Sequence, residues 1–138
     1  PKKSDVKGQK GSGLAEFVKS CQDNEFSWEK ISYIREQSGM PVFAKGVMCR
    51  EDARLALESG IDGLYVSNHG ARQLDTTPAT IEILKEIVEE VDQFEREQGR
   101  RAPIWFDGGI RHGSDILKAL ALGADLVWIG RPVLWALG

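Results

Sequence analysis

Four continuous runs of apolar residues, separated by segments with helical periodicity, are the feature that most constrains the fold of this chain. The runs are PVFAKGV at 41–47, GLYVSN at 63–68, APIWFDGG at 102–109 and LVWIGR at 126–131. Apolar residues follow one another in these runs and do not alternate with polar ones, which is typical of parallel strands covered on both faces. The sequence therefore predicts a parallel sheet.

The segments between and before the runs predict helices. Apolar side chains recur there every three or four residues, as in amphipathic helices. We expect four such helices, at residues 28–38, 50–59, 78–97 and 114–122. A glycine follows each segment within two residues, which is where helices commonly stop. The last residues, PVLWALG at 132–138, are expected to begin a further helix.

Strand–helix cycles with short connections predict βαβ units, and two architectures contain them. A doubly wound open sheet concentrates polar residues near one switch point, whereas a (β/α)₈ barrel gathers them beyond the carboxyl ends of all its strands. Here polar residues or glycines end every run, at Lys45, at 67–69, at 107–109 and at 130–131. We therefore predict the α/β class, with four βα units that form the C-terminal half of a (β/α)₈ TIM barrel.

Composition excludes several classes of protein. With 138 residues, 41% hydrophobic and 28% charged, the chain has the make-up of one globular domain. A net charge of -3 gives no reason to expect a nucleic-acid surface, and no apolar run is long enough to span a membrane. Cys21 and Cys49 lie far apart without histidines at metal-ligand spacing. We therefore expect no metal site and two reduced thiols in a soluble intracellular protein.

The two ends of the chain differ from its middle. The first residues are rich in Lys, Gly and Ser, so we expect residues 1–26 to be a flexible loop remnant before a domain at 27–138. The chain begins with Pro1 and ends inside a helical pattern. We therefore expect both ends to be cut from a longer protein.

Glycines follow the third and fourth runs, in DGGIRHG and IGR, and an arginine comes shortly after them in both places. Phosphate needs backbone N–H groups within reach, and glycine lets the backbone approach without a Cβ in the way. Asp107 can accept hydrogen bonds from a polyol, while Arg111 and Arg131 can balance phosphate charge. The alternative is that these glycines only make tight turns. Two consecutive strand ends with such glycines favour a phosphate site, because barrels often bind phosphate after their last two strands.

The stretch SNHGARQ at 67–73 ends the second run and carries His69 and Arg72. Histidine is the side chain most easily poised as a base near neutral pH, and arginine offers a planar fork for a carboxylate. A lone histidine is more often structural, but this position at a strand end favours catalysis. Lys45 would be buried in a barrel and would need an anionic partner. The sequence leaves two partners of Lys45 equally open: a structural carboxylate and an anionic ligand.

These motifs resemble the FMN-dependent α-hydroxy-acid oxidases and dehydrogenases, the family of glycolate oxidase, lactate oxidase and mandelate dehydrogenase. The resemblance runs from about residue 27 to 138 and is carried by PVFAKGV, SNHGARQLD and APIWFDGGIRHGSDILKALALGADLVWIGRPVLW. It implies FMN as cofactor and the oxidation of a small (S)-2-hydroxy acid to a 2-oxo acid. Electrons would pass to oxygen, a cytochrome or a quinone.

The resemblance also implies a role for each candidate residue. His69 would be the catalytic base, and Arg72 would bind the substrate carboxylate. Lys45 and Ser67 would contact the flavin ring, with Lys45 stabilising the negative charge that develops there. Asp107 would hold the ribityl chain. The phosphate end would consist of Gly108, Gly109, Arg111, Gly130 and Arg131.

Other parts of the family's site cannot be located in this sequence, namely the substrate tyrosines, a second arginine and the aspartate paired with the histidine. Without that carboxylate His69 is a weaker base, so we expect the chain alone to be a poor enzyme. Its two edge strands favour self-association, including a homo-oligomer. Two alternatives stay open: another flavin- or phosphate-binding barrel enzyme, or a catalytically incompetent half-barrel that acts only in binding or assembly.

Overall fold

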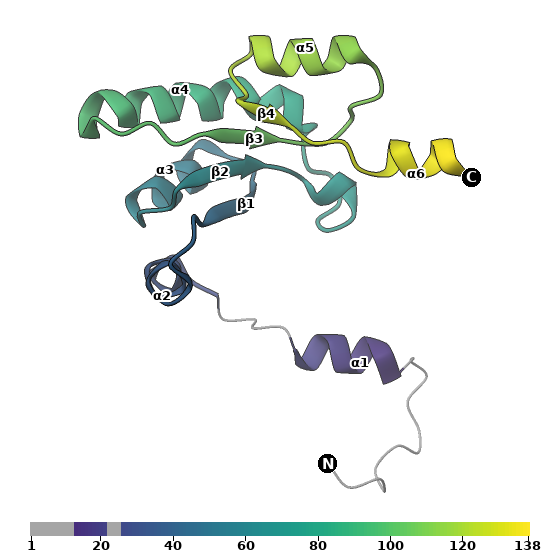
Figure 1. The fold of residues 1–138 in the computed structure, drawn as a ribbon, viewed down its shortest axis with the longest axis horizontal. Coiled ribbons are helices and arrows are strands. Elements are labelled where there is room, and N and C mark those ends of the chain that lie inside the picture. Colours follow the sequence, from purple (N-terminus) through teal and green to yellow (C-terminus); the bar gives the residue numbers. More distant parts are fainter. Residues whose placement is uncertain (1–12, 22–25) are drawn as a thin grey trace, which may run out of the picture.

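A four-stranded parallel sheet forms the body of the protein. The computed structural model describes residues 13–21 and 26–138 (Figure 1). The strands lie in the order of the sequence and all run in the same direction. They are β1 (Phe43–Val47), β2 (Gly63–Val66), β3 (Ile104–Phe106) and β4 (Leu126–Val127). The predicted α/β class and the four parallel strands are confirmed.

The predicted helices are also present, each within two residues of its expected bounds. They are α2 (Glu29–Ser38), α3 (Arg50–Glu58), α4 (Thr80–Gln98), α5 (Gly113–Ala121) and α6 (Arg131–Leu137). Gly39 and Gly99 end α2 and α4 with φ of 61° and 69°, and their N–H groups donate to carbonyls of the preceding turn. Left-handed glycine caps of this kind stop helices at low cost. No helix of the described residues is long and apolar enough to cross a membrane.

A further helix lies within the segment that was predicted to be a loop. Helix α1 (Gly13–Ser20) has exposed side chains wherever they are described, including Leu14 and Phe17. The rest of the predicted loop remnant, 1–12 and 22–25, lies outside the described residues. Part of that segment is therefore helical.

The core lies between the sheet and helices α3 and α4. Successive strand residues point to opposite faces of a sheet, and one set here is fully buried: Leu64, Val66, Ile104 and Phe106. These side chains belong to one cluster with buried residues of α3 and α4, namely Ala53, Ala56, Leu57, Leu84, Ile87 and Val91. Full burial of each large apolar side chain contributes about 1.5–3 kcal/mol. This face fixes the sheet against the helices.

The opposite face of the sheet, here called the inner face, carries an aromatic cluster. Phe43 stacks on Trp105 with ring centroids 3.9 Å apart, and Tyr65 meets Trp105 edge to face at 5.9 Å. Trp128 joins both, at 6.2 Å from Tyr65 and 5.4 Å from Trp105. Trp128 is 44% exposed, so the described residues cover this face only in part.

Gly63 makes the stacking of Phe43 on Trp105 possible. A Cβ at Gly63 would fall well inside van der Waals contact with three ring atoms of Phe43. Phe43 on β1 therefore reaches across β2, at the one position without a side chain, to touch β3. A glycine is needed here because the Phe43 ring comes so close to the backbone, and not because the backbone angle is unusual.

We expect Gly63→Ala to destabilise the fold by about 1–3 kcal/mol, the usual cost of overpacking. Urea unfolding followed by tryptophan fluorescence measures this. Phe43→Leu removes the ring, so adding it to Gly63→Ala should recover part of the loss in a double-mutant cycle. An unchanged midpoint for Gly63→Ala would show that the ring does not lie over the glycine.

Candidate functional site

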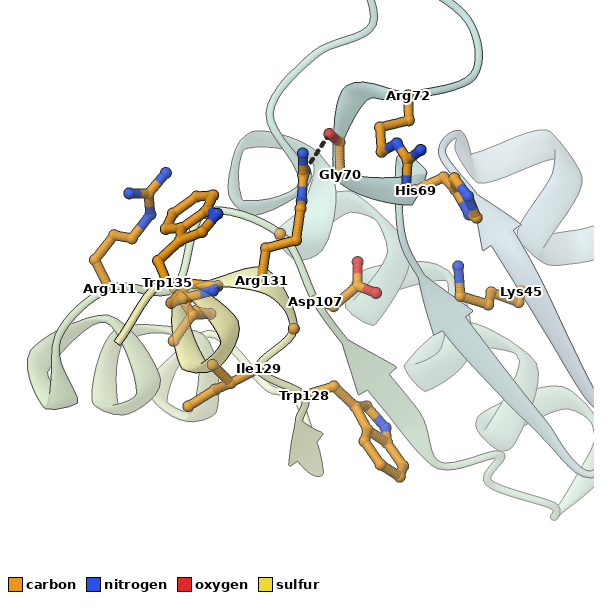
Figure 2. A pocket seen from close by; sticks show the side chains of 15 residues that line it. Lys45, His69, Gly70, Arg72, Asp107, Arg111, Trp128, Ile129, Arg131 and Trp135 are labelled. Atoms are coloured by element: carbon orange, nitrogen blue, oxygen red, sulfur yellow. Dashed lines mark hydrogen bonds between the residues drawn. The ribbon is translucent and has the colours of Figure 1, made fainter. Parts of the chain in front are cut away.

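The carboxyl ends of the four strands surround one hollow of about 300 Å³ (Figure 2). Nine of the ten predicted site residues line it: Lys45, His69, Arg72, Asp107, Gly108, Gly109, Arg111, Gly130 and Arg131. The tenth, Ser67, is buried and bonded to two of them. The structure thus brings residues from all four strand ends together.

Ser67 connects the first two strand ends. Its hydroxyl accepts hydrogen bonds from Lys45 Nζ and from the backbone N–H of His69, both at 3.1 Å. The Lys45 ammonium also lies 5.2 Å from the centre of the Tyr65 ring, an attractive cation–π distance. Lys45 is exposed here because the inner face of this four-stranded sheet is open, whereas its burial was expected of a closed barrel. Its partners are a hydroxyl and a ring, with no carboxylate among the described residues.

The turn after β2 has a left-handed backbone. His69, Gly70 and Ala71 have φ of 58°, 64° and 58°, although two of them are not glycine. Asn68 holds this turn: its Oδ1 accepts from the N–H of Ala71 at 3.1 Å, and its Nδ2 donates to Pro78 O at 3.4 Å. Non-glycine residues in this region cost on the order of 1–3 kcal/mol each and cluster at functional sites.

The strained turn presents His69 and Arg72 to the hollow. Figure 2 shows both side chains on the side of the hollow where Lys45 lies. Both residues are exposed. Within 13–21 and 26–138, no carboxylate bonds to the His69 ring or to the Arg72 guanidinium. The base and the carboxylate-binding group predicted from the sequence are therefore free to meet a ligand.

Asp107, at the end of β3, has an unusual environment. Its Oδ1 is buried and has no hydrogen-bond partner among residues 13–21 and 26–138. The backbone around it is fixed, since its N–H donates to Val66 O at 3.1 Å and its carbonyl accepts from Thr80 Oγ1 at 2.7 Å. Burial, and then the negative charge of Asp107, raise the pKa of Tyr65. A buried carboxylate oxygen without a donor is costly, so this atom is poised to accept a hydrogen bond from a bound molecule.

Glycine backbone forms the adjoining wall of the hollow. Gly108 and Gly109 have φ of 101° and 73°, which side chains rarely tolerate. Apart from each glycine and its two chain neighbours, no described residue has an atom within 4 Å of the position that a Cβ would take at Gly109 or at Gly130. The backbone at these two residues is therefore open to an approaching ligand, as phosphate binding requires.

Two arginines flank this glycine wall. The Arg111 guanidinium lies over the Trp135 ring at 4.5 Å, and Arg131 Nη2 donates to Gly70 O at 2.5 Å (Figure 2). Asp115 fixes the Arg111 loop by accepting from the N–H groups of Arg111 and His112, at 3.0 and 2.9 Å. These two bonds hold the pKa of the Asp115 carboxyl below its usual value. Both arginines thus have set positions before any anion binds.

Sequence reasoning missed several residues of the hollow. Trp128, Ile129 and Trp135 line it. Their place in the sequence was a usable signal: Trp128 and Ile129 lie in the fourth run directly before Gly130, and Trp135 follows Arg131 by one helical turn. His112, next to Arg111, is exposed and does not line the hollow.

Comparisons with known proteins agree on one group. Residues 2–138 match the family model described as FMN-dependent dehydrogenase. The chain is 48% identical to 2-hydroxyacid oxidase 1 of Homo sapiens over 91% of this chain and 32% of that protein. It is 52% identical to glycolate oxidase 3 of Oryza sativa subsp. japonica, over 91% of this chain and 32% of that protein.

Solved structures give the same result. A lactate oxidase of Pediococcus acidilactici superposes with a TM-score of 0.76 at 40% identity, over 90% of this chain and 33% of that chain. A mandelate oxidase superposes with a TM-score of 0.76 at 42% identity, over 92% and 35%. The four-stranded sheet matches half of the barrel fold in these enzymes. The chain spans about a third of the length of the relatives that it matches.

The family match is longer than the resemblance found in the sequence. That resemblance was expected to start near residue 27, whereas the family model aligns from residue 2. The matched region therefore includes the segment predicted to be a loop remnant, and its assignment as a loop remnant stays a prediction.

We expect Asn68→Ala to loosen the turn that carries His69 and Arg72, because it removes the acceptor of the Ala71 N–H and the donor to Pro78. Each lost hydrogen bond costs about 0.5–1.5 kcal/mol. Hydrogen exchange of residues 69–72 measures the effect. Asn68→Asp, which keeps the acceptor, serves as the matched control and should exchange more slowly than Asn68→Ala. Equal exchange in the two variants would contradict this role of Oδ1.

Proposed function

Because the chain belongs to the FMN-dependent dehydrogenase family, we propose that its hollow holds the FMN of a barrel that oxidises a small 2-hydroxy acid to a 2-oxo acid. The observation that carries this proposal is the convergence of Lys45, His69, Arg72, Asp107 and the glycine wall on one hollow. The similarity to proteins named oxidases favours oxygen as the electron acceptor.

Three features of the hollow fit the ribityl phosphate of FMN. The unpaired Oδ1 of Asp107 can accept from a ribityl hydroxyl. The open backbone at Gly109 and Gly130 can approach phosphate oxygens. Arg111 and Arg131 supply the positive charge that a phosphate needs, at the same end of the hollow.

The opposite end of the hollow fits the flavin ring. FMN, when bound, supplies the acceptor for the two electrons that leave the substrate. Lys45, which donates to Ser67 at 3.1 Å, would present its ammonium group to that ring. A fixed cation stabilises developing negative charge without reorganising, which is the basis of electrostatic catalysis. The Ser67 hydroxyl accepts from Lys45 and so keeps the ammonium in place.

His69 and Arg72 act on the substrate. Arg72 binds the carboxylate through two parallel N–H donors, which orients the α-carbon and its hydroxyl toward the His69 ring. A ring nitrogen of His69 then accepts a proton from the substrate. The resulting imidazolium needs a negative neighbour, and none of the described residues bonds to this ring. Full activity therefore depends on a carboxylate from outside the described residues.

The phosphate end can be tested with two ligands. We expect the purified chain to bind FMN at least tenfold more tightly than riboflavin, because only FMN carries the phosphate that faces Arg111 and Arg131. Quenching of flavin fluorescence measures both dissociation constants. Asp107→Ala should weaken both ligands, while Asp92→Asn, at a half-buried position of α4 that does not line the hollow, should weaken neither. Equal affinity for the two flavins would contradict the assignment of the phosphate site.

The surroundings of His69 predict slow turnover. We expect the 138-residue chain with saturating FMN to oxidise glycolate or lactate at least a hundredfold more slowly than a full-length relative, since no carboxylate of the described residues pairs with His69. Oxygen consumption measures the rate, and His69→Gln should abolish what remains while leaving FMN affinity unchanged. A rate close to that of a relative, or activity that survives His69→Gln, would contradict the role given to His69.

A further inference from the structure

We propose that Thr80 is a positioning residue for the cofactor: its hydroxyl holds the peptide that joins Asp107 to Gly108, and thereby orients both residues toward the ribityl phosphate. Thr80 begins α4, is 2% exposed and does not line the hollow. It acts through Asp107 and Gly108, which do line it. The part of this inference that concerns the cofactor rests on the proposed function, whereas the hold on the backbone does not.

The hydrogen bond of Thr80 leaves its own helix. Its Oγ1 donates to Asp107 O at 2.7 Å, across 27 residues of sequence. A buried hydroxyl without a partner is costly, so nearly all buried hydroxyls are hydrogen-bonded. Thr80 uses its one side-chain donor on the carbonyl that follows β3. The start of α4 is thus joined to the end of β3.

Asp107 is fixed on both sides by this arrangement. Its N–H donates to Val66 O at 3.1 Å, and its carbonyl is held by Thr80. With both peptide groups fixed, the Cα–Cβ bond of Asp107 has one direction. Figure 2 shows that the carboxylate points into the hollow. The position of the unpaired Oδ1 therefore depends on the backbone that Thr80 holds.

The same hydrogen bond sets the direction of the Gly108 N–H. The carbonyl of Asp107 and the N–H of Gly108 belong to one planar trans peptide, in which the two groups point in opposite directions. Because the carbonyl points toward Thr80, the Gly108 N–H points away from it. Within 13–21 and 26–138 this N–H donates to no acceptor. It is therefore able to donate to an oxygen atom of the cofactor.

Thr80 and Gly108 are also in direct contact. A Cβ at Gly108 would lie 2.7 Å from Thr80 Oγ1 and 3.4 Å from Thr80 Cγ2. A threonine side chain is branched at Cβ, which restricts its rotamer and keeps both γ atoms against this backbone. Gly108 has a φ of 101°, which favours glycine. Thr80 thus supports the glycine wall from outside the hollow.

Thr80 is itself held in place by its neighbours in the chain. The N–H of Ala79 donates to Glu82 Oε2 at 3.0 Å, and Pro78 O accepts from Asn68 Nδ2 at 3.4 Å. Asn68 holds the turn after β2. The start of α4 is therefore joined to two neighbouring strand ends, and Thr80 provides the connection to the cofactor end.

Two substitutions of Thr80 separate the effect of the hydroxyl from that of side-chain shape. Thr80→Val replaces the hydroxyl with a methyl group of similar size, and Thr80→Ser keeps the hydroxyl. We expect Thr80→Val to raise the dissociation constant of FMN about fivefold, the size expected for one lost hydrogen bond. Riboflavin should be affected less, because the glycine wall faces the phosphate that only FMN carries. Thr80→Ser should restore the affinity of the unmodified chain for FMN.

Thr77→Val is the matched control. It makes the same change three residues earlier, at a half-buried position that does not line the hollow, and should leave both affinities unchanged. Quenching of flavin fluorescence measures all dissociation constants. An FMN affinity of Thr80→Val equal to that of the unmodified chain, or a loss that Thr80→Ser does not restore, would overturn the proposal.

Nuclear magnetic resonance of the ¹⁵N-labelled chain without flavin tests the hold on the backbone alone. The Gly108 amide signal should shift in Thr80→Val and not in Thr80→Ser, while the amides of Leu84 and Val91 in α4 keep their positions and report that the variant is folded. In the unmodified chain the Thr80 hydroxyl proton should exchange slowly enough to give its own signal, a readout that needs no variant.

The two measurements distinguish this proposal from the proposed function. Equal affinity of the unmodified chain for FMN and riboflavin would contradict the proposed phosphate site, and the Gly108 signal would still decide whether Thr80 holds this backbone. A Gly108 signal that stays in place in Thr80→Val, or a Thr80 hydroxyl proton that exchanges as fast as those of exposed threonines, would overturn the role of Thr80 even if FMN binds.

Discussion

Parallel pairing of the four strands is the constraint on which the rest of the structure depends. Lys45 pairs with Tyr65, Tyr65 with Trp105, and Trp105 with Leu126, so these residues lie at one level across the sheet. Residues two positions further along a strand point to the same face. Ser67 and Asp107 therefore emerge one step above the level of Lys45, Tyr65 and Trp105, where the Lys45 side chain reaches Ser67. The register thus places the groups of the hollow together before any loop geometry is considered.

The loops then refine what the register provides. The turn at 69–71 stores backbone strain, which Asn68 and Ser67 offset with hydrogen bonds to its N–H groups. Arg131 ties this turn to the fourth strand end through Gly70 O, and a Cβ at Gly70 would collide with its guanidinium. This contact connects the turn that carries His69 and Arg72 with the fourth strand end. Strain kept by several independent contacts is a common mark of preorganised sites.

Much of this could be predicted from the sequence, because the signals were local. Glycines after each helical segment marked the helix ends, and continuous apolar runs marked the strands. That the candidate residues meet in one hollow could be predicted because strand ends of a parallel sheet meet at one edge. The remainder depended on tertiary structure. Continuous apolar runs do not reveal which residues face inward, so the aromatic cluster was not foreseen. Positive φ at His69 and Ala71 is imposed by surrounding hydrogen bonds and has no composition signal. The exposure of Lys45 follows from an inner face that the described residues leave open.

The central claim is that the glycine wall and the two arginines bind the phosphate of FMN. Nuclear magnetic resonance of the ¹⁵N-labelled chain tests it most directly, because Gly109 and Gly130 each contribute one backbone amide signal. Both signals should shift when FMN is added and should stay in place when riboflavin is added at the same concentration. Shifts of equal size with riboflavin, or shifts confined to residues away from the hollow, would contradict the account.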